Sequence, residues 1–266
     1  MAKRTRLDAE LVRRGHARSR GHAAEIIEGG LVKVAGIVAS KAATQVGQDQ
    51  PIVVRTPSDE PPYVSRGAHK LIGALDAFSL NVADRRALDA GASTGGFTDV
   101  LLRRGAAHVT AVDVGYGQLA WSLRSNDRVR VMERVNVREL TPEMIGEPRP
   151  DLVVGDLSFI SLKLVLGPLQ GVVAPEADFA MMVKPQFEVG KDRVGAGGVV
   201  REPELRAGAV ADVAAHALTL GLGTVDVAAS PLPGPSGNVE YFLWLRSGAP
   251  ALDPARLERA VAEGPA

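Results

Sequence analysis

The chain has 266 residues, of which 45% are hydrophobic, and its 31 Lys and Arg balance 31 Asp and Glu. This length permits one large α/β domain and one small module. The absence of cysteine from the sequence excludes disulfides and thiolate nucleophiles, and five scattered histidines make a metal site a poor prediction. The N-terminus is basic and no apolar run approaches the ~18 residues of a membrane span, so we expect a cytoplasmic protein with no metal and no membrane partner.

Positive charge is concentrated at the N-terminus. Residues 1–50 contain nine Lys or Arg and five Asp or Glu, so the rest of the chain is mildly acidic. A basic head on an acidic body favours a polyanionic partner. Taken alone, however, a run of charges is more often a solvated helix face.

The head is predicted to contain two short helices followed by strands. The first helix ends at Gly15, and the second begins after an N-cap at Ser19 and ends at residues 29–30. A strand is expected at 31–36, and one or two more within 40–54.

A linker separates this head from the rest of the chain. Residues 55–65 read RTPSDEPPYVS, and the prolines prevent a regular element. We therefore predict a small domain over 1–56, a linker over 57–64, a large domain over 65–248 and a loosely held tail over 249–266.

The large domain alternates strands with helices. Strands are expected within 87–91, 108–115, 129–135, 151–158, 177–184, 224–230 and 238–246, and the clearest helices at 95–105 and 203–221. Such alternation predicts a doubly wound parallel sheet with its ligands at the carboxyl ends of the strands.

The turn after the first of these strands, DAGASTGGF at 89–97, differs from a dinucleotide fingerprint because Ser and Thr replace the second glycine. Asp89 would repel a pyrophosphate, which disfavours a nicotinamide cofactor, but would suit a ligand with positive charge. Asp113, at the end of the next strand, can accept hydrogen bonds from ribose hydroxyls. The turn therefore predicts a nucleoside ligand such as S-adenosylmethionine, although ordinary turn glycines and caps remain the alternative.

Four isolated charges lie near strand or helix ends of the predicted sheet: Lys70, Asp156, Lys184 and Glu240. Asp156 could be a helix cap and Lys70 an exposed helix residue, but a charge beside a buried strand needs a partner. Two lysines and two carboxylates can satisfy one another in a shared cleft. A buried lysine beside another cation can also act as a base towards a hydroxyl group, which methyl transfer to a ribose oxygen requires.

The residue order supports a family resemblance. Arg6-Leu7-Asp8, Arg14-Gly15 and Ser19-Arg20, followed by apolar residues to Gly36, resemble the S4 RNA-binding domain. The four charges and the 89–97 turn resemble the Lys-Asp-Lys-Glu tetrad of FtsJ-like ribose 2′-O-methyltransferases. With the strings DVGYGQLAW, DLSFISL, VKPQFEVGK and PLPGPSGNVEYFLWL, residues 4–246 resemble the TlyA family of ribosomal RNA methyltransferases.

This resemblance implies an α/β fold, with a Rossmann-like class I S-adenosylmethionine methyltransferase domain behind a small α+β S4-like domain. It implies 2′-O-methylation of a cytidine in the 16S rRNA of the 30S subunit and of one in the 23S rRNA of the 50S subunit, by a protein that we expect to be a monomer. Lys184 would be the base, and Lys70, Asp156 and Glu240 would tune it and orient the ribose. The alternatives are a non-catalytic RNA-binding protein and a membrane-active haemolysin, a label that the family carries.

The candidate site residues follow. Those for the cofactor are Asp89, Gly91, Ala92, Ser93, Thr94, Gly95, Gly96, Phe97, Asp113, Asn136 and Asp156. Those for RNA phosphates are Arg4, Arg6, Arg14, Arg18, Arg20, Lys33, Arg66, Lys191 and Arg193, the last two on a flexible loop expected at 190–200.

Three of the candidate interpretations stay open. Asn136 could bind an adenine edge or simply stabilise a turn. Phe97 could line the cofactor cleft or be a buried helix residue. Phe159 could stack on an extruded target base or pack in the core. In addition, the linker motif Arg-Xaa-Trp-Val, described for TlyA proteins that modify both subunits, is replaced here by residues 61–64, Pro-Pro-Tyr-Val.

Overall fold

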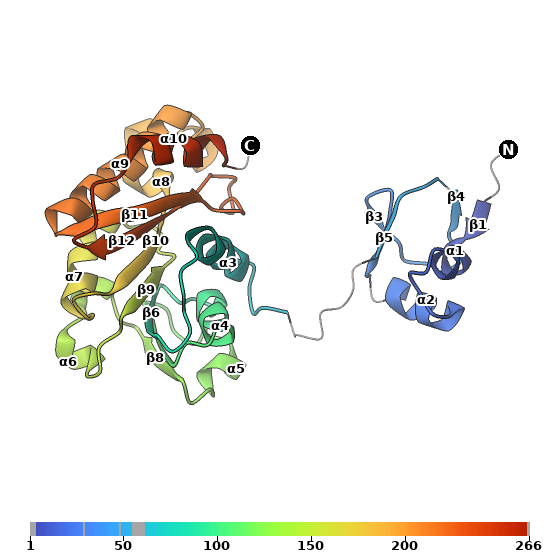
Figure 1. Ribbon diagram of the computed structural model, residues 1–266, viewed down its shortest axis with the longest axis horizontal. Coiled ribbons are helices and arrows are strands. Elements are labelled where there is room, and N and C mark those ends of the chain that lie inside the picture. Colours follow the sequence, from blue (N-terminus) through green and yellow to red (C-terminus); the bar gives the residue numbers. More distant parts are fainter. Residues whose placement is uncertain (1–3, 29, 48, 55–61, 265–266) are drawn as a thin grey trace. The chain divides into compact units, whose positions relative to one another are not determined.

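The computed structural model describes residues 4–28, 30–47, 49–54 and 62–264 (Figure 1). Contacts divide the chain into two compact units, Met1–Pro62 and Tyr63–Ala266. This division falls inside the segment 57–64 that the sequence predicts as a linker. Residues 55–61 lie outside the described residues. They include Pro61, the first of the four residues that replace the Arg-Xaa-Trp-Val motif.

The small unit combines two helices with short antiparallel strands. Its elements are β1 (Arg4–Arg6), α1 (Leu7–Arg13), α2 (Arg20–Glu28), β2 (Val32–Val34), β3 (Ile37–Val38), β4 (Gln45–Gly47) and β5 (Ile52–Val54). β1 pairs with β4, and β2 lies between β3 and β5. The predicted N-cap is confirmed, because Ser19 Oγ accepts a hydrogen bond of 3.1 Å from the His22 amide. Both helices pack on a core that includes Leu7, Leu11 and Ile27.

The large unit is built on a seven-stranded sheet in the order β11-β12-β10-β9-β6-β7-β8. Its strands are β6 (Arg86–Ala90), β7 (His108–Asp113), β8 (Val129–Glu133), β9 (Leu152–Gly155), β10 (Asp178–Val183), β11 (Leu222–Ala229) and β12 (Tyr241–Ser247). Its helices are α3 (Gly67–Phe78), α4 (Gly96–Arg103), α5 (Trp121–Arg124), α6 (Pro142–Ile145), α7 (Leu166–Gly171), α8 (Pro185–Glu188), α9 (Pro203–Thr219) and α10 (Pro254–Ala262).

One strand runs against the predicted parallel direction. β12 is antiparallel to both β10 and β11, whereas β6, β7, β8, β9 and β10 are parallel where they pair. Residues 230–240 join β11 to β12 without a helix. A connection of this kind cannot carry the chain back to the other end of the sheet, so the two strands run in opposite directions.

Helices cover both faces of the sheet, and successive strand residues point to opposite faces. Val153, Phe179 and Tyr241 join a core with α7, α9 and α10. Their neighbours Leu152, Ala180 and Phe242 join a second core with α3 and α4. Figure 1 shows α3 and α4 on one side of the strands and α9 and α10 on the other. The α/β methyltransferase-like architecture expected from the sequence is therefore confirmed.

Two segments that the sequence predicts to be loose or flexible contain elements of secondary structure. The tail after residue 248 forms α10, which buries Leu257 and Ala260 against the core, so the loosely held tail is wrong. The segment 190–200 contains two 3-10 turns, Lys191–Arg193 and Ala196–Gly198. Its end is fixed because the Val200 amide donates to Asn238 Oδ1 over 2.9 Å.

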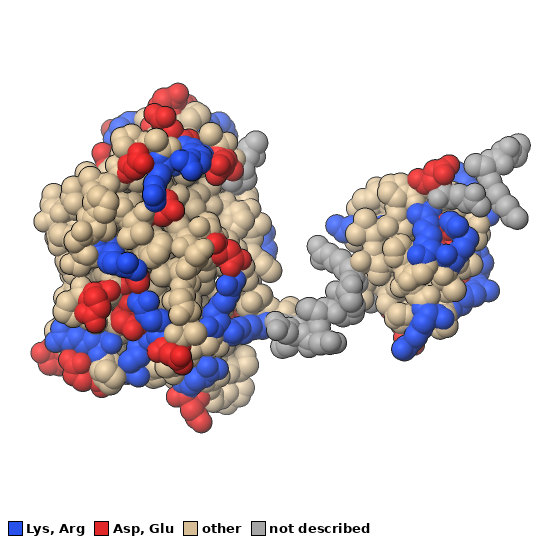
Figure 2. All heavy atoms as spheres, in the orientation of Figure 1, with Lys and Arg blue, Asp and Glu red and all other residues tan. Residues whose placement is uncertain are grey.

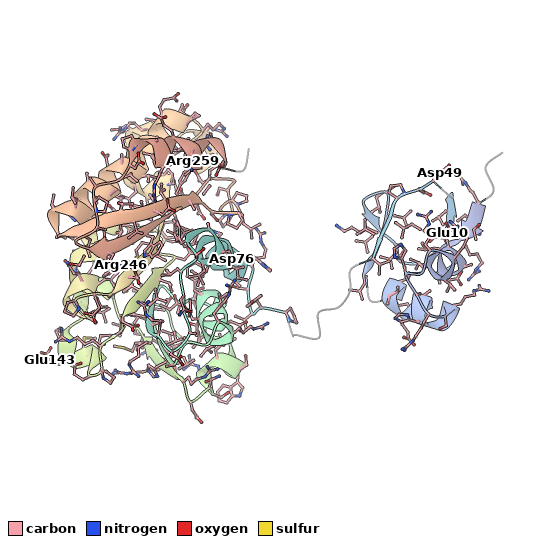
Figure 3. The ribbon with its side chains drawn as sticks, in the orientation of Figure 1. Glu10, Asp49, Asp76, Glu143, Arg246 and Arg259 are labelled. Atoms are coloured by element: carbon pink, nitrogen blue, oxygen red, sulfur yellow. The ribbon has the colours of Figure 1, made fainter. Side chains whose placement is uncertain are left out.

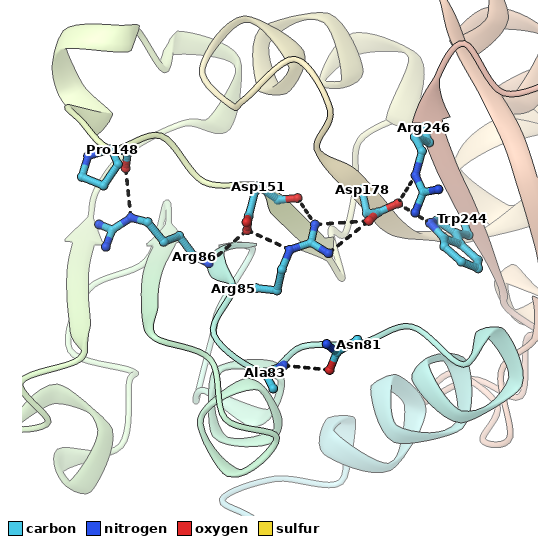
Figure 4. Close-up of polar contacts among 9 residues, drawn as sticks. All are labelled: Asn81, Ala83, Arg85, Arg86, Pro148, Asp151, Asp178, Trp244 and Arg246. Atoms are coloured by element: carbon cyan, nitrogen blue, oxygen red, sulfur yellow. Dashed lines mark hydrogen bonds and ion pairs between the residues drawn. The ribbon is translucent and has the colours of Figure 1, made fainter.

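A polar network closes the amino-terminal edge of the parallel strands (Figure 4). Asp178, with its side chain 4% exposed, accepts hydrogen bonds from Trp244 Nε1 and Arg246 Nε at 2.7 Å each, and pairs with Arg85 at 3.2 Å. Asp151 also pairs with Arg85, at 3.0 Å. This network stabilises the edge of the sheet opposite to the one where ligands are expected.

Candidate active site

The first of two candidate pairs joins α3 to the start of β12. Lys70 lies in the first turns of α3, and Glu240 immediately precedes β12. Lys70 Nζ lies 2.5 Å from Glu240 Oε2, and the two side chains are 10% and 1% exposed. The alternative that Lys70 is an exposed helix residue is therefore excluded. A buried ammonium and a buried carboxylate compensate one another here.

The second pair lies at the ends of β9 and β10. Lys184 Nζ lies 2.6 Å from Asp156 Oδ1 and donates a hydrogen bond of 2.8 Å to Ser158 Oγ. Lys184 is 8% exposed. Because β9 and β10 are parallel neighbours, their carboxyl ends place the two residues side by side.

The two pairs border one cavity of about 250 Å³. Lys70, Asp156 and Lys184 line it, together with most of the 91–97 turn. Glu240 lies behind Lys70 through their ion pair. The structure thus brings the four predicted charges together beside the predicted cofactor turn.

A second cavity of about 340 Å³ adjoins the first, since both are lined by Gly91, Ser93, Asp156 and Ser158. Its far end is lined by Asp113, and its walls by apolar residues that include Val114, Val135, Val137 and Leu157. Apolar walls with a carboxylate at one end suit a nucleoside, whose base is flat and whose ribose carries hydroxyls. Together the cavities form an elongated cleft along the carboxyl edge of the sheet.

The glycines of the turn have a steric purpose. Gly91 has φ +87°, and an added Cβ would lie 3.1 Å from the carbonyl oxygen of Asp156. A Cβ on Gly96 would lie 3.0 Å from the Ala68 amide nitrogen. The turn therefore packs closely against the loop after β9 and against α3, which carry Asp156 and Lys70.

Asp89 lies beneath the turn and is fully buried. Its Oδ2 accepts a hydrogen bond of 2.7 Å from Thr98, while Oδ1 has no hydrogen-bond partner among the described residues. Burial raises the pKa of Asp89 to about 7, the nearby charge of Asp156 adds to the increase, and the Thr98 hydrogen bond opposes it. A carboxylate oxygen left without a donor beside this turn is compatible with a cationic ligand group.

Asp113 already accepts hydrogen bonds from the backbone. Its Oδ2 accepts from the Ser93 amide at 2.8 Å and its Oδ1 from the Gly115 amide at 2.6 Å. Each carboxylate oxygen can accept further bonds, and the residue is only partly buried at the cavity wall. Asp113 thus fixes the turn and can also meet ribose hydroxyls.

The structure bears on each of the three open interpretations. Asn136 Oδ1 accepts from the Arg138 amide at 3.1 Å, so this oxygen stabilises the turn, and the neighbours Val135 and Val137 line the cavity instead. Phe97 satisfies both interpretations, because it is 4% exposed yet lines the first cavity. Phe159 is 90% exposed, so core packing is wrong for it.

Comparisons with known proteins agree with this geometry. Residues 63–247 match the profile of the FtsJ-like methyltransferases, and residues 5–52 match the S4 domain. The chain is 61% identical, over all of both sequences, to the 16S/23S rRNA (cytidine-2′-O)-methyltransferase TlyA of Mycobacterium tuberculosis. It is 35% identical to the 23S rRNA (cytidine-2′-O)-methyltransferase TlyA of Campylobacter jejuni, over 68% of this chain and 70% of the relative.

A solved structure from Streptococcus thermophilus, described as a candidate hemolysin, is also similar. Its TM-score is 0.74 at 36% identity, and the match covers 99% of this chain and 96% of the other. The chain belongs to the TlyA family of FtsJ-like methyltransferases. The predicted resemblance and the methyltransferase class are thereby confirmed.

Among the residues that the structure describes, no helix is long and apolar enough to cross a membrane. The same residues contain no group of three or more His, Cys, Asp or Glu that could hold a metal ion.

The predicted RNA contacts of the S4 domain divide into two groups. Arg4 and Arg18 are exposed, and Lys33 is partly buried on β2. Arg6 and Arg20 both pair with Asp8, at 3.0 and 2.9 Å, while each remains about half exposed. Basic side chains cluster on the visible face of this domain (Figure 2).

Arg14 was predicted to contact RNA phosphates, but its guanidinium makes contacts within the domain. It pairs with Glu10 at 2.8 Å, donates to the carbonyl oxygen of Gln50 at 2.9 Å, and is 20% exposed. Glu10, labelled in Figure 3, is itself 1% exposed and also pairs with Arg13. The hydrogen bonds from Arg13 and Arg14 lower the pKa of Glu10 to about 2. Arg14 therefore ties α1 to the β4–β5 connection.

The predicted RNA contacts of the methyltransferase domain are Arg66, Lys191 and Arg193. Arg66 is exposed directly before α3. Arg193 is exposed, and its Nε donates to the Val189 carbonyl oxygen at 2.8 Å. Lys191 begins a 3-10 turn, and its side chain lies outside the described residues.

The end of the linker is anchored on α4. The Val64 amide donates to Asp99 Oδ2 over 3.0 Å, and the Arg103 guanidinium lies 4.1 Å from the centre of the Tyr63 ring. Asp99 and Arg103 in turn pair at 2.8 Å. Tyr63 thus keeps an aromatic anchor at the position where the TlyA motif has tryptophan.

Sequence reasoning missed Ser158, which contacts Lys184 and lines both cavities. Its position two residues after Asp156, in the same loop at a strand end, was the available signal. Val135 and Val137 were also missed, because apolar residues beside a strand end look like ordinary core.

Proposed function

We propose that the protein uses S-adenosylmethionine to methylate the ribose 2′-oxygen of cytidine in ribosomal RNA. The observation that carries the proposal is the pairing of Lys70 with Glu240 and of Lys184 with Asp156 around one cavity, beside a nucleoside-shaped cleft. The family's TlyA relatives from Mycobacterium tuberculosis and Campylobacter jejuni bear names for this reaction.

The cleft suits S-adenosylmethionine in three places. Val135 and Val137 offer apolar contact to the adenine, and Asp113 lies where ribose hydroxyls would be met. Asp89 is fully buried beneath the turn and lines neither cavity, so we propose that its charge favours the ammonium of the methionine part through the turn rather than by direct contact. When bound there, the cofactor supplies an electrophilic methyl group on a positively charged sulfur.

The protein's own residues prepare the acceptor oxygen. We assign Lys184 as the base that takes the 2′-hydroxyl proton, with Asp156 holding its amine in place. Lys70, fixed by Glu240, presents a second cation to the same cavity and orients the ribose. Methyl transfer to oxygen is an in-line displacement, so positioning contributes much of the acceleration.

Phe159 is placed to hold the target base. Its ring is exposed at the wall of the second cavity and lies 5.2 Å from the ring of Phe187. Its φ of +63° is unusual for a non-glycine residue. We propose that a cytosine extruded from the RNA stacks on Phe159.

Both ribosomal subunits are proposed substrates, as the resemblance implies. The Mycobacterium tuberculosis relative bears a 16S/23S name and the Campylobacter jejuni relative a 23S name, and the match to the former has the higher identity and covers more of the chain. The S4 domain would hold the RNA backbone through Arg4 and Arg18. We propose that the enzyme acts as a monomer in the cytoplasm, where the subunits are.

The proposal is tested with the purified full chain, labelled S-adenosylmethionine, and separately isolated 30S and 50S subunits that lack the modification. Transfer of label to a cytidine 2′-oxygen in either subunit supports methylation, and transfer to both supports dual specificity. Loss of transfer in Lys184→Ala, with cofactor binding retained, supports the assigned base. If neither subunit accepts label although cofactor binds, the protein is a non-catalytic RNA-binding protein.

A further inference from the structure

Ser158 occupies a position that the tetrad does not account for. It follows Asp156 in the loop after β9, is exposed, and lines both cavities of the cleft. Its Oγ accepts a hydrogen bond of 2.8 Å from Lys184 Nζ. Ser158 is therefore a hydrogen-bond acceptor for the amine, whereas Asp156 Oδ1, its ion-pair partner at 2.6 Å, makes no hydrogen bond among the described residues.

We propose that Ser158 is a positioning residue that, together with Asp156, aims the lone pair of the Lys184 amine at the ribose 2′-hydroxyl. This inference rests on the proposed function. An unprotonated lysine amine has two N–H groups and one lone pair. If Ser158 accepts one N–H group, as it does here, and the other N–H turns towards the Asp156 carboxylate at 2.6 Å, the lone pair is left for the cavity.

The proton transfer then balances. As the methyl carbon moves from sulfur to the 2′-oxygen, the 2′-O–H bond breaks and its proton forms the third N–H bond of Lys184. The sulfonium becomes a neutral thioether, and the positive charge passes to the lysine, beside the carboxylate of Asp156. With Asp156 as the single acceptor, the amine could rotate about its Cε–Nζ bond, and fewer of its orientations would be productive.

The loop that carries Ser158 is fastened to the segment that carries Lys184. α8 begins directly after Lys184, and its Phe187 ring packs 5.2 Å from Phe159. At the end of α8, Glu188 accepts hydrogen bonds from Ser161 Oγ at 2.6 Å and from the Leu162 amide at 2.8 Å. These contacts keep the distance between Ser158 and Lys184 fixed, which a positioning role requires.

The test compares single-turnover methyl transfer by the full chain and its variants, with cofactor and subunit both saturating, across a range of pH. Ser158→Thr keeps the hydroxyl, whereas Ser158→Val has nearly the same shape without it. Ser125→Ala is the matched control, because Ser125 is exposed at the end of α5 and its Oγ donates to the Trp121 carbonyl oxygen. Cofactor affinity and thermal unfolding are measured for each variant.

We expect Ser158→Val and Ser158→Ala to lower the single-turnover rate by about tenfold or more, and to move the acid limb of the pH–rate profile. Ser158→Thr should stay within about threefold of the wild type, and Ser125→Ala should match it. Cofactor affinity and thermal unfolding should change little in any variant, since Ser158 is exposed.

Two results would overturn the inference. Equal rates for the Thr and Val variants at every pH would show that the hydroxyl has no role. A loss in Ser158→Val that resides wholly in cofactor or subunit affinity would make Ser158 a binding residue. If the wild type itself transfers no methyl group, the proposed function fails first and takes the inference with it. The thermal unfolding data separate a lost hydroxyl from a damaged fold, and the Thr and Val pair remains comparable even if the Ala variant is unstable.

Discussion

Lys70 Nζ lies 2.5 Å from Glu240 Oε2, although the two residues are 170 positions apart in the sequence. The pair links the helix that leads into the sheet to the antiparallel strand β12. It also places a fixed cation at the cavity that Lys184 and Asp156 share. Because both groups are buried, loss of either one should affect the stability of the fold as well as the site.

Lys70→Met should destabilise the protein as well as inactivate it. The substitution leaves the Glu240 carboxylate buried without its cation, which costs about 3–5 kcal/mol of unfolding free energy. Lys70→Met/Glu240→Gln should recover much of that stability but no activity, because neither partner remains charged. Urea unfolding monitored by circular dichroism measures the stability of the single and the double variant. A Lys70→Met variant that unfolds at the wild-type urea concentration would contradict a buried, interdependent pair.

Asp89→Asn should stabilise the cofactor-free protein, by an amount that depends on pH, and should weaken cofactor binding. Burial raises the pKa of Asp89 to about 7, whereas an aspartate in the unfolded chain titrates near pH 3.9. The unfolded state therefore loses this proton first, and Asp89 lowers the stability of the cofactor-free protein progressively from about pH 4 to about pH 7. Asparagine cannot ionise, yet its amide oxygen can still accept from Thr98.

The expected result is a higher melting temperature for Asp89→Asn at pH 8 and almost no difference at pH 4. The variant should bind S-adenosylmethionine more weakly, because the ligand's ammonium loses a negative partner. Differential scanning fluorimetry and calorimetric titration measure the two effects. The same gain in melting temperature at both pH values would show that Asp89 ionisation is not its cause.

Asp178→Asn should weaken the fold without touching the chemistry. Asp178 lies in the polar network at the amino-terminal edge of the sheet, away from the cleft (Figure 4). Loss of its charged hydrogen bonds to Arg246 and Trp244 should cost about 1–3 kcal/mol. Burial alone would raise the pKa of Asp178, but the Arg246 and Trp244 hydrogen bonds and the Arg246 charge outweigh it, so the pKa lies below its ordinary value.

A carboxyl with a depressed folded pKa contributes stability above its unfolded pKa and loses it as pH falls through the folded value. The difference between wild type and Asp178→Asn should therefore be full at pH 7 and shrink in acid. The methylation rate per folded molecule should stay unchanged. A difference in unfolding free energy that persists at acid pH would argue against an ionic role for Asp178.

Arg18→Ala and Arg14→Ala should separate RNA binding from folding within the S4 domain. Arg18 is exposed, so its loss should weaken RNA binding and lower the slope of log affinity against log salt by about 1, with no loss of stability. Arg14 is tied to Glu10 and Gln50, so its loss should lower the melting temperature of the domain. Fluorescence anisotropy at several salt concentrations, with thermal unfolding of both variants, makes the comparison. Equal salt slopes for Arg18→Ala and the wild type would remove Arg18 from the RNA contacts.

The sequence was sufficient to predict that Asp156 and Lys184 lie together because of how parallel sheets are built. Asp156 and Lys184 follow neighbouring parallel strands, whose carboxyl ends meet at one edge. The glycines of the 91–97 turn were equally readable, since only glycine tolerates the approach of the Asp156 carbonyl at Gly91. These features depend on local pattern and on one general rule of topology.

Other features depend on contacts that a local pattern does not contain. Arg14 looked like its neighbours in a basic run, and only the fold brings it to Gln50. Asn136 had two roles available, and only the fold shows that its Oδ1 accepts a hydrogen bond from the Arg138 amide. The burial of Asp89 and the packing of α10 on α9 and β11 likewise result from tertiary structure, which overrides the composition of each segment.

The measurement that tests the central claim most directly is methyl transfer from labelled S-adenosylmethionine to unmodified 30S and 50S subunits, with the site mapped in the RNA. The wild type should label a cytidine 2′-oxygen. Lys184→Ala should lose at least about 100-fold in rate, as expected for removal of a general base, while it still binds the cofactor. Label at a base nitrogen or carbon, or a Lys184→Ala variant that methylates ribose at the wild-type rate, would contradict the account.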